Sequence, residues 1–313
     1  MDQKPTIGIT RPYRSYSDYF REQYGQKAYR VAVDAGFSCP NRAGRDRPGC
    51  TYCEVSGARA PYLDQIEGLN DQVERGVAFL RRRYNAALFV LYFQAYTGTF
   101  APLHKLRRLY DHGLSLHPFR ELVVSTRPDC VNSAVTRLLA SYRSETRDVW
   151  VELGLQSAHN RTLDRVRRGH SVEDFARAFD LLKTHGIKVA VHLMFGLPGE
   201  GWSEIRQTID YLARRKPDGV KIHNLHIPYG APLYGQYLAG GMPVIGPERH
   251  LRYTVGAIER LPEPTVIMRL TCDSYRTDRA APRRFWDKQR FAREVEREMR
   301  SRSTWQGRLL GRR

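Results

Sequence analysis

The stretch CPNRAGRDRPGCTYC, residues 39–53, holds three of the five cysteines of the chain. Cys50 and Cys53 have two residues between them, a spacing that brings two thiolates to one metal centre. Cys39 can supply a third sulfur, because the turns expected at Gly44 and Gly49 let the loop fold back. A four-iron cluster takes four ligands, so three thiolates predict a cluster with one iron open to a substrate or cosubstrate.

Two other interpretations of these cysteines stay open. Free cysteines pack in protein cores as small apolar side chains, although a polar loop rich in Gly, Pro and Arg is an unusual place for them. A structural zinc site needs a fourth Cys or His ligand, and no His occurs between Val31 and Leu103. Cys130 and Cys272 are solitary, and we expect both to be ordinary packed cysteines.

Apolar segments rich in β-branched and aromatic residues alternate with amphipathic stretches, a pattern typical of βα units in a parallel sheet. Six strands are expected, at Val31–Asp34, Leu88–Phe93, Glu121–Thr126, Val149–Leu155, Ile187–Phe195 and Val220–Ile227. Helices are expected at Leu69–Tyr84, at Pro102–His112 with Gly113 as the stop, at Val131–Tyr142, at Val172–His185, and at Ser203–Arg215 with Ser203 as the N-cap. Further helices are expected at Glu248–Arg260 and around Phe291, Val295 and Met299.

Polar motifs stand at the ends of these strands, where doubly wound sheets and barrels both place function. The motifs after the first four strands are Cys39, Gln94–Thr97, Thr126–Asp129 and Gln156–Ser157. His192 lies within the fifth strand, which ends in the segment GLPGE at residues 196–200. The sixth strand ends in three substrate-pocket candidates, His223, Asn224 and His226.

The net charge of +18 is large, and eight Lys leave 43 Arg among the 51 basic residues. Such a charge favours polyanions such as RNA. However, Arg content also follows genomic base composition, and no helix-turn-helix, RNA-recognition or zinc-finger signature accompanies the charge. From Arg283 onward, eleven basic residues stand against four acidic ones, so this basic tail is either a solvated face or an RNA-binding arm.

The longest apolar run, Ala86–Phe93, is too short to span a bilayer, and the first 24 residues lack the apolar core of a signal peptide. We therefore expect a cytoplasmic protein with reduced thiols and no membrane association. The 313 residues suit two average domains or one barrel with extensions. We divide the chain into an N-terminal extension (residues 1–30), a core barrel (31–234) and a C-terminal appendage (235–313), in which the strand–helix alternation fades.

Five ordered motifs together resemble the radical S-adenosylmethionine (SAM) superfamily. They are the cysteine stretch (CxNRxG leading to GCxYC), YFQAYT at 92–97, STRPD at 125–129, ELGLQS at 152–157 and RGH at 168–170. The resemblance is to the branch that contains the Elongator catalytic subunit and oxygen-independent coproporphyrinogen oxidase. Within that branch, the chain most resembles a small group of uncharacterised bacterial proteins. It spans about Tyr13 to Lys288.

The resemblance implies an α/β fold, a partial (β/α)6 TIM-type barrel with a mostly helical C-terminal appendage. It also implies a [4Fe–4S] cluster at the top of the barrel, whose open iron chelates the amino and carboxylate groups of SAM. Reduction would then break a sulfur–carbon bond of SAM and give a 5′-deoxyadenosyl radical that abstracts hydrogen.

Individual residues take roles from the same resemblance. The implied cluster ligands are Cys39, Cys50 and Cys53, with Tyr52 against the adenine. Gln94, Tyr96 and Thr97 stand where a Gly-Gly-Glu motif usually binds the methionyl amino group. Gln156 matches a strand-four glutamine, and Arg168 matches the arginine that pairs with the methionyl carboxylate. The ribose contacts or pocket walls would come from Ser125, Thr126, Arg127 and Asp129, although the Arg-Pro-Asp turn could equally be a salt-bridged loop. His192 is either an adenosine or substrate contact or a core histidine.

The cysteine spacing departs from most of the superfamily, since ten residues instead of three separate Cys39 from Cys50. The Elongator-like branch also has a lengthened loop at this place. The first hypothesis is a radical SAM enzyme of unknown substrate, with RNA or another acidic macromolecule favoured by the charge and an electron donor such as flavodoxin or ferredoxin. The alternative is a non-enzymatic RNA-binding protein with a structural metal at the three cysteines. A third possibility, an assembly partner that has lost its chemistry, conflicts with the retention of Gln156 and Arg168.

Overall fold

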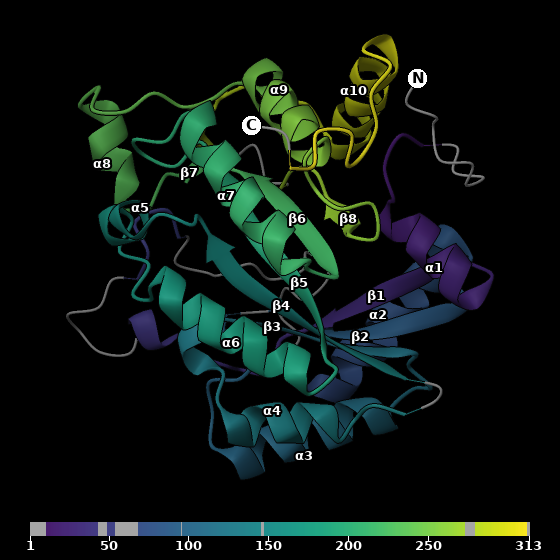
Figure 1. Cartoon of the computed structure of the whole chain (residues 1–313). Helices are drawn as coiled ribbons and strands as arrows, with labels where there is room; N and C mark the ends of the chain where they lie inside the picture. Colours follow the sequence, from purple (N-terminus) through teal and green to yellow (C-terminus); the bar gives the residue numbers. More distant parts are fainter. Residues whose placement is uncertain are drawn as a thin grey trace.

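The computed structural model of the chain describes residues 11–42, 49–53, 68–94, 96–144, 147–272 and 279–311. Its centre is a seven-stranded sheet in which all neighbouring strands are parallel, in the order β1-β2-β3-β4-β5-β6-β8 (Figure 1). The strands are β1 (Ala28–Val33), β2 (Leu88–Phe93), β3 (Glu121–Thr126), β4 (Asp148–Gln156), β5 (Lys188–Phe195), β6 (Gly219–Asn224) and β8 (Val266–Arg269). A separate antiparallel pair consists of β7 (Ile227–Pro228) and β9 (Arg279–Ala281).

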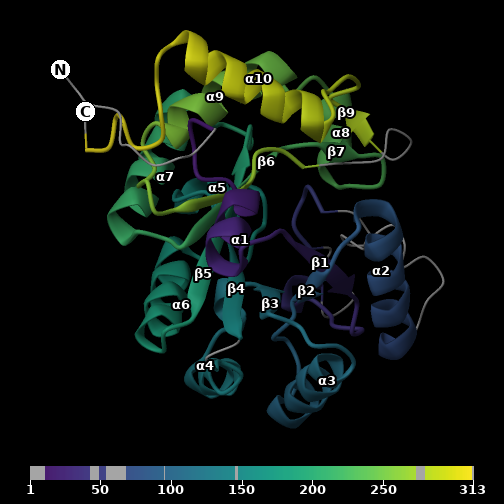
Figure 2. The same ribbon diagram turned by 90° about the vertical axis from the view of Figure 1, so that its right-hand side faces the viewer.

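The sheet curls, and Figure 2 shows α2, α3, α4, α6 and α7 arranged around its outer side. The helices are α1 (Tyr16–Tyr24), α2 (Leu69–Tyr84), α3 (Leu103–Ser115), α4 (Ser133–Ala140), α5 (Asn160–Arg165), α6 (Val172–Thr184), α7 (Trp202–Arg215), α8 (Leu233–Leu238), α9 (Pro247–Ile258) and α10 (Lys288–Ser301). Consecutive parallel strands with helices on one side form a partial barrel, which confirms the predicted fold. No helix in the described ranges is both long and apolar enough to cross a membrane.

Three predicted helix ends are wrong, each for a local reason. Gly113 does not stop α3. It lies inside the helix, where a Cβ would come within 3.0 Å of Leu91, so the close packing of α3 on β2 explains the glycine. The N-cap of α7 is Gly201, whose N–H donates to the Glu204 carboxylate at 2.8 Å, and not Ser203. The helix α4 begins only after Asn132, whose side chain accepts a hydrogen bond from a first-turn N–H. The turn predicted at Gly44 lies outside the described residues.

Three strand predictions differ from the structure by more than one residue at an end. The first expected strand, Val31–Asp34, is β1, which begins three residues earlier, at Ala28. The expected sixth strand, Val220–Ile227, divides into β6 and the short β7, because the chain leaves the barrel sheet after Asn224. A seventh barrel strand, β8, comes from the region predicted as a mostly helical appendage and pairs with β6. Its four residues, VIMR, are too short a run to stand out from neighbouring loop sequence.

The sheet separates two apolar cores. The outer core lies between the strands and the surrounding helices, with side chains such as Leu91 and Val151. The inner core lies on the concave side, where Tyr19 and Phe20 of α1 pack with Val90 and Trp150. Because those strand residues belong to the amino-terminal halves of their strands, α1 fills the amino-terminal end of the barrel lumen. Site residues at the carboxyl ends of the strands therefore lie at the opposite end.

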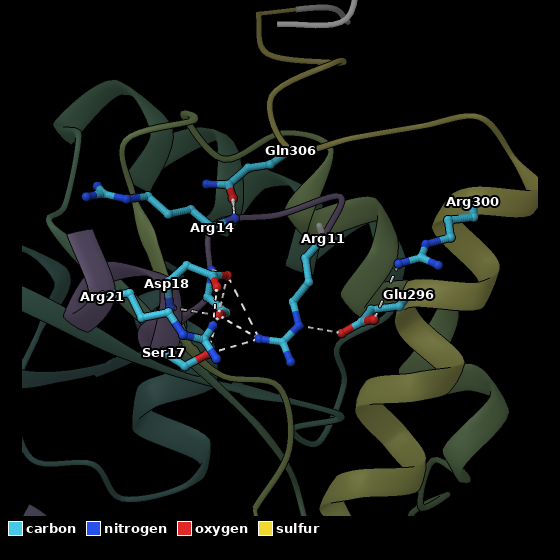
Figure 3. A network of polar contacts seen from close by, with 9 residues as sticks. Arg11, Arg14, Ser17, Asp18, Arg21, Glu296, Arg300 and Gln306 are labelled. Carbon is cyan, nitrogen blue, oxygen red and sulfur yellow. Dashed lines mark hydrogen bonds and ion pairs between the residues drawn. The ribbon is translucent and has the colours of Figure 1, made fainter. Parts of the chain in front are cut away.

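The segment before α1 is tied to the C-terminal part of the chain, as Figure 3 shows. The Arg11 guanidinium donates to Glu296 of α10 at 2.8 Å and to the Ser15 hydroxyl at 3.0 Å. The backbone N–H of Arg14 donates to the side chain of Gln306 at 2.9 Å. These contacts join the two ends of the described chain beside β8, where the Ile267 N–H donates to the Arg14 carbonyl and Ile267 forms a parallel bridge with Ser15.

Candidate active site

A pocket at the carboxyl ends of the strands brings together most of the predicted site residues. Its walls consist of Cys39, Arg42, Gly49, Cys50, Cys53, Tyr96, Thr97, Ser125, Thr126, Arg127, Gly154, Gln156, Arg168 and His192. Nine of the eleven predicted cluster ligands and cofactor contacts are among them. Tyr52 and Gln94 are not. The Tyr52 ring packs on an apolar cluster that contains Leu197, and the Gln94 N–H donates to the Val33 carbonyl.

Cys50 is buried between two hydrogen-bond donors. The amide of Asn41 donates to its sulfur at 3.4 Å, and the guanidinium of Arg168 donates to it at 3.6 Å. Burial raises the pKa of the Cys50 thiol, but the charge and hydrogen bond of Arg168 outweigh burial and leave the pKa below its ordinary value. The thiolate is the form that binds metal, so this environment favours the ligand form of Cys50.

Arg168 is held in place through each of its side-chain nitrogens. Its Nε donates to Nε2 of His170 at 3.0 Å, and its Nη2 donates to the Gly154 carbonyl at 3.2 Å. Burial and the neighbouring charge of Arg168 lower the pKa of His170 to about 3, so this imidazole is neutral and accepts the hydrogen bond. Gly154 is required here, because a Cβ at that position would lie 2.4 Å from the Arg168 guanidinium. The motif RGH predicts Arg168, but its spacing gives no sign that His170 orients it.

The arginine of the STRPD motif both lines the pocket and forms a salt-bridged turn. Arg127 is almost fully buried and makes two parallel hydrogen bonds to Asp129, at 2.9 and 3.0 Å. Its remaining nitrogen, Nη1, donates to the backbone carbonyl of Arg168 at 2.8 Å. The sequence left open whether this motif is a pocket wall or an ion-paired loop, and the structure shows that it is both.

A β-bulge turns Gln156 into the pocket. Gly154 pairs with His192 and Gln156 pairs with Leu193, so one extra residue stands in β4 at this point. Gln156 has a φ of 71°, in the left-handed region that non-glycine residues rarely adopt. Such irregularities re-aim side chains and occur beside active sites. The sequence predicted Gln156 as a site residue, but no pattern in it predicted the bulge.

His192 connects the pocket to a charged network in the barrel lumen. Its Nε2 donates to the Glu152 carboxylate at 3.0 Å, and Tyr92 donates to the same carboxylate at 2.6 Å. Glu152 is fully buried, and it also pairs with Arg30 at 2.7 Å and with the buried Lys221. Burial lowers the pKa of His192 to about 4, although Glu152 acts in the opposite direction. A neutral His192 that donates from Nε2 has Nδ1 left as an acceptor.

Glu152 stays ionised in this network. Burial alone would raise its pKa, but the positive charges of Arg30 and Lys221 outweigh burial and hold the pKa well below its usual range. Sequence reasoning assigned no role to Glu152 or Lys221. The available signal was a charged residue inside each of two predicted strands, because a buried charge must be paired.

The three cysteines fit a cluster ligand set, since all of them line one pocket and the donors around Cys50 favour its thiolate, although burial raises the pKa of Cys53. No group of three or more His, Cys, Asp or Glu in the described ranges is spaced around a single metal ion. A four-iron cluster binds each thiolate through a different iron, so its ligands need not converge on one point. Cys130 and Cys272 are partly exposed and do not line the pocket.

Comparison with known families identifies this arrangement. Residues 38–212 match the model of the radical SAM superfamily, and residues 217–301 match the radical SAM C-terminal domain. The chain belongs to the radical SAM superfamily. Membership confirms the resemblance of the five motifs and the predicted cofactors of this family, a [4Fe–4S] cluster and SAM.

Individual relatives agree with this radical SAM assignment. Protein YhcC of Escherichia coli K12 is 37% identical over 275 residues, which cover 88% of this chain and 87% of YhcC. The tRNA uridine(34) acetyltransferase of Methanocaldococcus infernus is 39% identical over 127 residues, 38% of this chain and 22% of that protein. The solved structure of Elp3 from the same archaeon, with an N-terminal deletion, has a TM-score of 0.72 at 20% identity. That match covers 89% of this chain and 64% of the Elp3 chain, and it confirms the fold of the Elongator-like branch.

Proposed function

We propose that this radical SAM protein cleaves SAM reductively and uses the resulting 5′-deoxyadenosyl radical to abstract hydrogen from a substrate. The observation that carries the proposal is one pocket lined by Cys39, Cys50 and Cys53 together with Gln156 and Arg168. When bound there, the cluster and SAM would supply the electron and the radical. The chain itself binds, orients and shields these groups.

The three thiolates would hold the cluster, and Arg168 would bind the carboxylate of SAM beside it. The Arg168 guanidinium already lies against the Cys50 sulfur, so a cation stands beside one of the thiolates that would hold the cluster. A guanidinium can give two parallel hydrogen bonds to a carboxylate. The second anchor is Gln156, which the β4 bulge turns into the same pocket. Tyr96, Thr97, Ser125 and His192 would complete the walls around the cosubstrate.

RNA is the substrate class that we propose. The chain carries a net charge of +18, and a relative over part of its length is named for acting on tRNA uridine(34). Thiolate ligands need a reducing compartment, so we place the protein in the cytoplasm, with flavodoxin or ferredoxin as the electron donor.

Adding bulk tRNA to the reconstituted, reduced protein should raise 5′-deoxyadenosine formation severalfold and change the mass of a nucleoside in the RNA. No rise and no mass change would remove RNA from the proposal.

Arg168→Ala should weaken SAM binding by about 10- to 100-fold, because a charge-assisted hydrogen bond contributes about 1.5–3 kcal/mol. The measurement is equilibrium dialysis of labelled SAM against the anaerobically reconstituted protein. Iron content should stay at the wild-type level, since Arg168 donates to Cys50 and is not itself a ligand. Arg177→Ala is the matched control, because the Arg177 side chain is 71% exposed on the outer helix α6. Unchanged SAM affinity in Arg168→Ala would exclude the proposed carboxylate contact.

A further inference from the structure

A second β-bulge places Arg269 inside the barrel. Val220 of β6 pairs with Ile267 of β8, but the next residue, Lys221, pairs with Arg269, so Met268 is the extra residue. A bulge of this kind lets consecutive side chains face the same side of the sheet. Lys221 faces the lumen, where it contacts Tyr92, so its cross-strand partner Arg269 faces the lumen as well. The β4 bulge that aims Gln156 into the pocket has its counterpart here, at the edge of the sheet.

Arg269 stands in a group of cations that is only partly neutralised. Arg30 and Lys221 share the single carboxylate of Glu152. Arg269 forms no hydrogen bond or ion pair with any residue in the described ranges. Like charges directly opposite one another on neighbouring strands destabilise a sheet, so the Lys221 and Arg269 pair has a cost that Glu152, which Lys221 shares with Arg30, offsets only in part. An anion bound between these strands would offset it.

A buried polar atom without a partner lies next to this group. His223 follows Lys221 by two residues on β6, and Nε2 of His223 has no hydrogen-bond partner in the described part of the chain. The ring of His223 lies 5.2 Å from the ring of His192, which lines the SAM pocket. After burial, the charge of Arg269 is the next cause that lowers the pKa of His223, so the two side chains are close. Unpaired buried polar atoms in native proteins often mark the place of a ligand or an ordered water.

We infer that Arg269, with His223 beside it, binds a phosphate group of the substrate at the lumen wall next to the SAM pocket. A guanidinium makes two parallel hydrogen bonds to phosphate, and Arg269 is the cation of this group that pairs with no carboxylate in the described ranges. Arg269 is partly exposed, so a bound group can reach it. The inference rests on the proposed function, because it names the part of an RNA substrate that would lie nearest the bound SAM.

Isothermal titration calorimetry with inorganic phosphate at constant ionic strength tests this site in the full-length reconstituted protein. The wild type should bind phosphate with a saturable Kd, and Arg269→Gln should weaken that binding by about tenfold or more. Arg269→Lys should lie between the two, because lysine keeps the charge but loses the planar fork. Arg297→Gln is the matched control: it removes one charge from a side chain that is 77% exposed on α10, and it should bind phosphate like the wild type.

Thermal unfolding gives a second readout that a purely structural arginine would not show. Arg269→Gln should melt at the wild-type temperature or above it, because the variant removes a like-charge pair. The inference would be overturned if phosphate binding to the wild type does not saturate, or if Arg269→Gln and Arg297→Gln weaken phosphate binding equally. It would also be overturned if acetate binds as tightly as phosphate. Intact SAM cleavage without phosphate binding would contradict this inference alone, whereas phosphate binding without SAM cleavage would contradict the proposed function alone.

Discussion

Cys50→Ala is expected to lose the iron–sulfur cluster. The wild type should carry about four irons per chain after anaerobic reconstitution, and the variant less than about one. Cys50 is the buried member of the three cysteines, and its thiol receives hydrogen bonds from Asn41 and Arg168. Its loss removes one of three protein ligands and the thiolate whose pKa the site lowers. Iron and sulfide assays on the purified, reconstituted variant measure the effect directly.

Cys130→Ala is the matched control for this substitution. Cys130 lies in the turn after β3, where burial raises its pKa and Cys39 is close enough to add to that rise, but it does not line the pocket. Removing it changes one thiol in the same region without touching the ligand set, so iron content should remain at the wild-type level. Cys50→Ala protein that keeps full iron, or Cys130→Ala protein that loses it, would show that the ligands are assigned wrongly.

Glu152→Ala is expected to destabilise the barrel by about 3–5 kcal/mol, because it leaves buried positive charges without their carboxylate. Glu152 is fully buried and accepts hydrogen bonds from Tyr92 and His192 while it pairs with Arg30 and Lys221. Since its pKa is held well below the usual range, its contribution is present at neutral pH and is lost only as the pH falls through that lowered value. Urea unfolding at neutral pH measures the loss.

Glu74→Ala provides the comparison for this stability measurement. Glu74 is an exposed residue of α2, so its removal should change the unfolding free energy by about 0.5 kcal/mol or less. A Glu152→Ala variant as stable as Glu74→Ala would mean that the lumen network contributes nothing to folding. Its role would then have to lie in the orientation of His192 alone.

The strands of the barrel were predictable because each is an apolar run of ordinary strand length between amphipathic helices. β2 and β3 match the predicted bounds, β4 is one residue longer at each end, β5 begins one residue later, and β1 begins three residues earlier than predicted. β8 was missed because its four residues have no period of their own, and pairing with β6 defines it. Gly113 was misread as a helix stop, because only the packed structure shows that the glycine makes room for Leu91.

The site was predictable as a set of motifs and not as a set of contacts. The cysteine spacing and the motif order indicated Cys39, Gln156 and Arg168, and the structure places all three on one pocket. Tyr52 and Gln94 carry the same motif support, yet neither lines the pocket. The Glu152 network and the position of Arg269 depend on strand register and on bulges of one residue. A one-residue shift turns side chains to the opposite face, and no sequence pattern here specifies where such a shift occurs.

Reductive cleavage of SAM by this protein is tested by measuring the products that SAM gives after reduction. The protein is purified without oxygen, reconstituted with iron and sulfide, reduced with dithionite and incubated with SAM, and 5′-deoxyadenosine is then quantified by chromatography. Wild-type protein with about four irons per chain is expected to form 5′-deoxyadenosine, and Cys50→Ala is expected to form none. Wild-type protein that binds zinc in place of iron and forms no 5′-deoxyadenosine would contradict the proposed function.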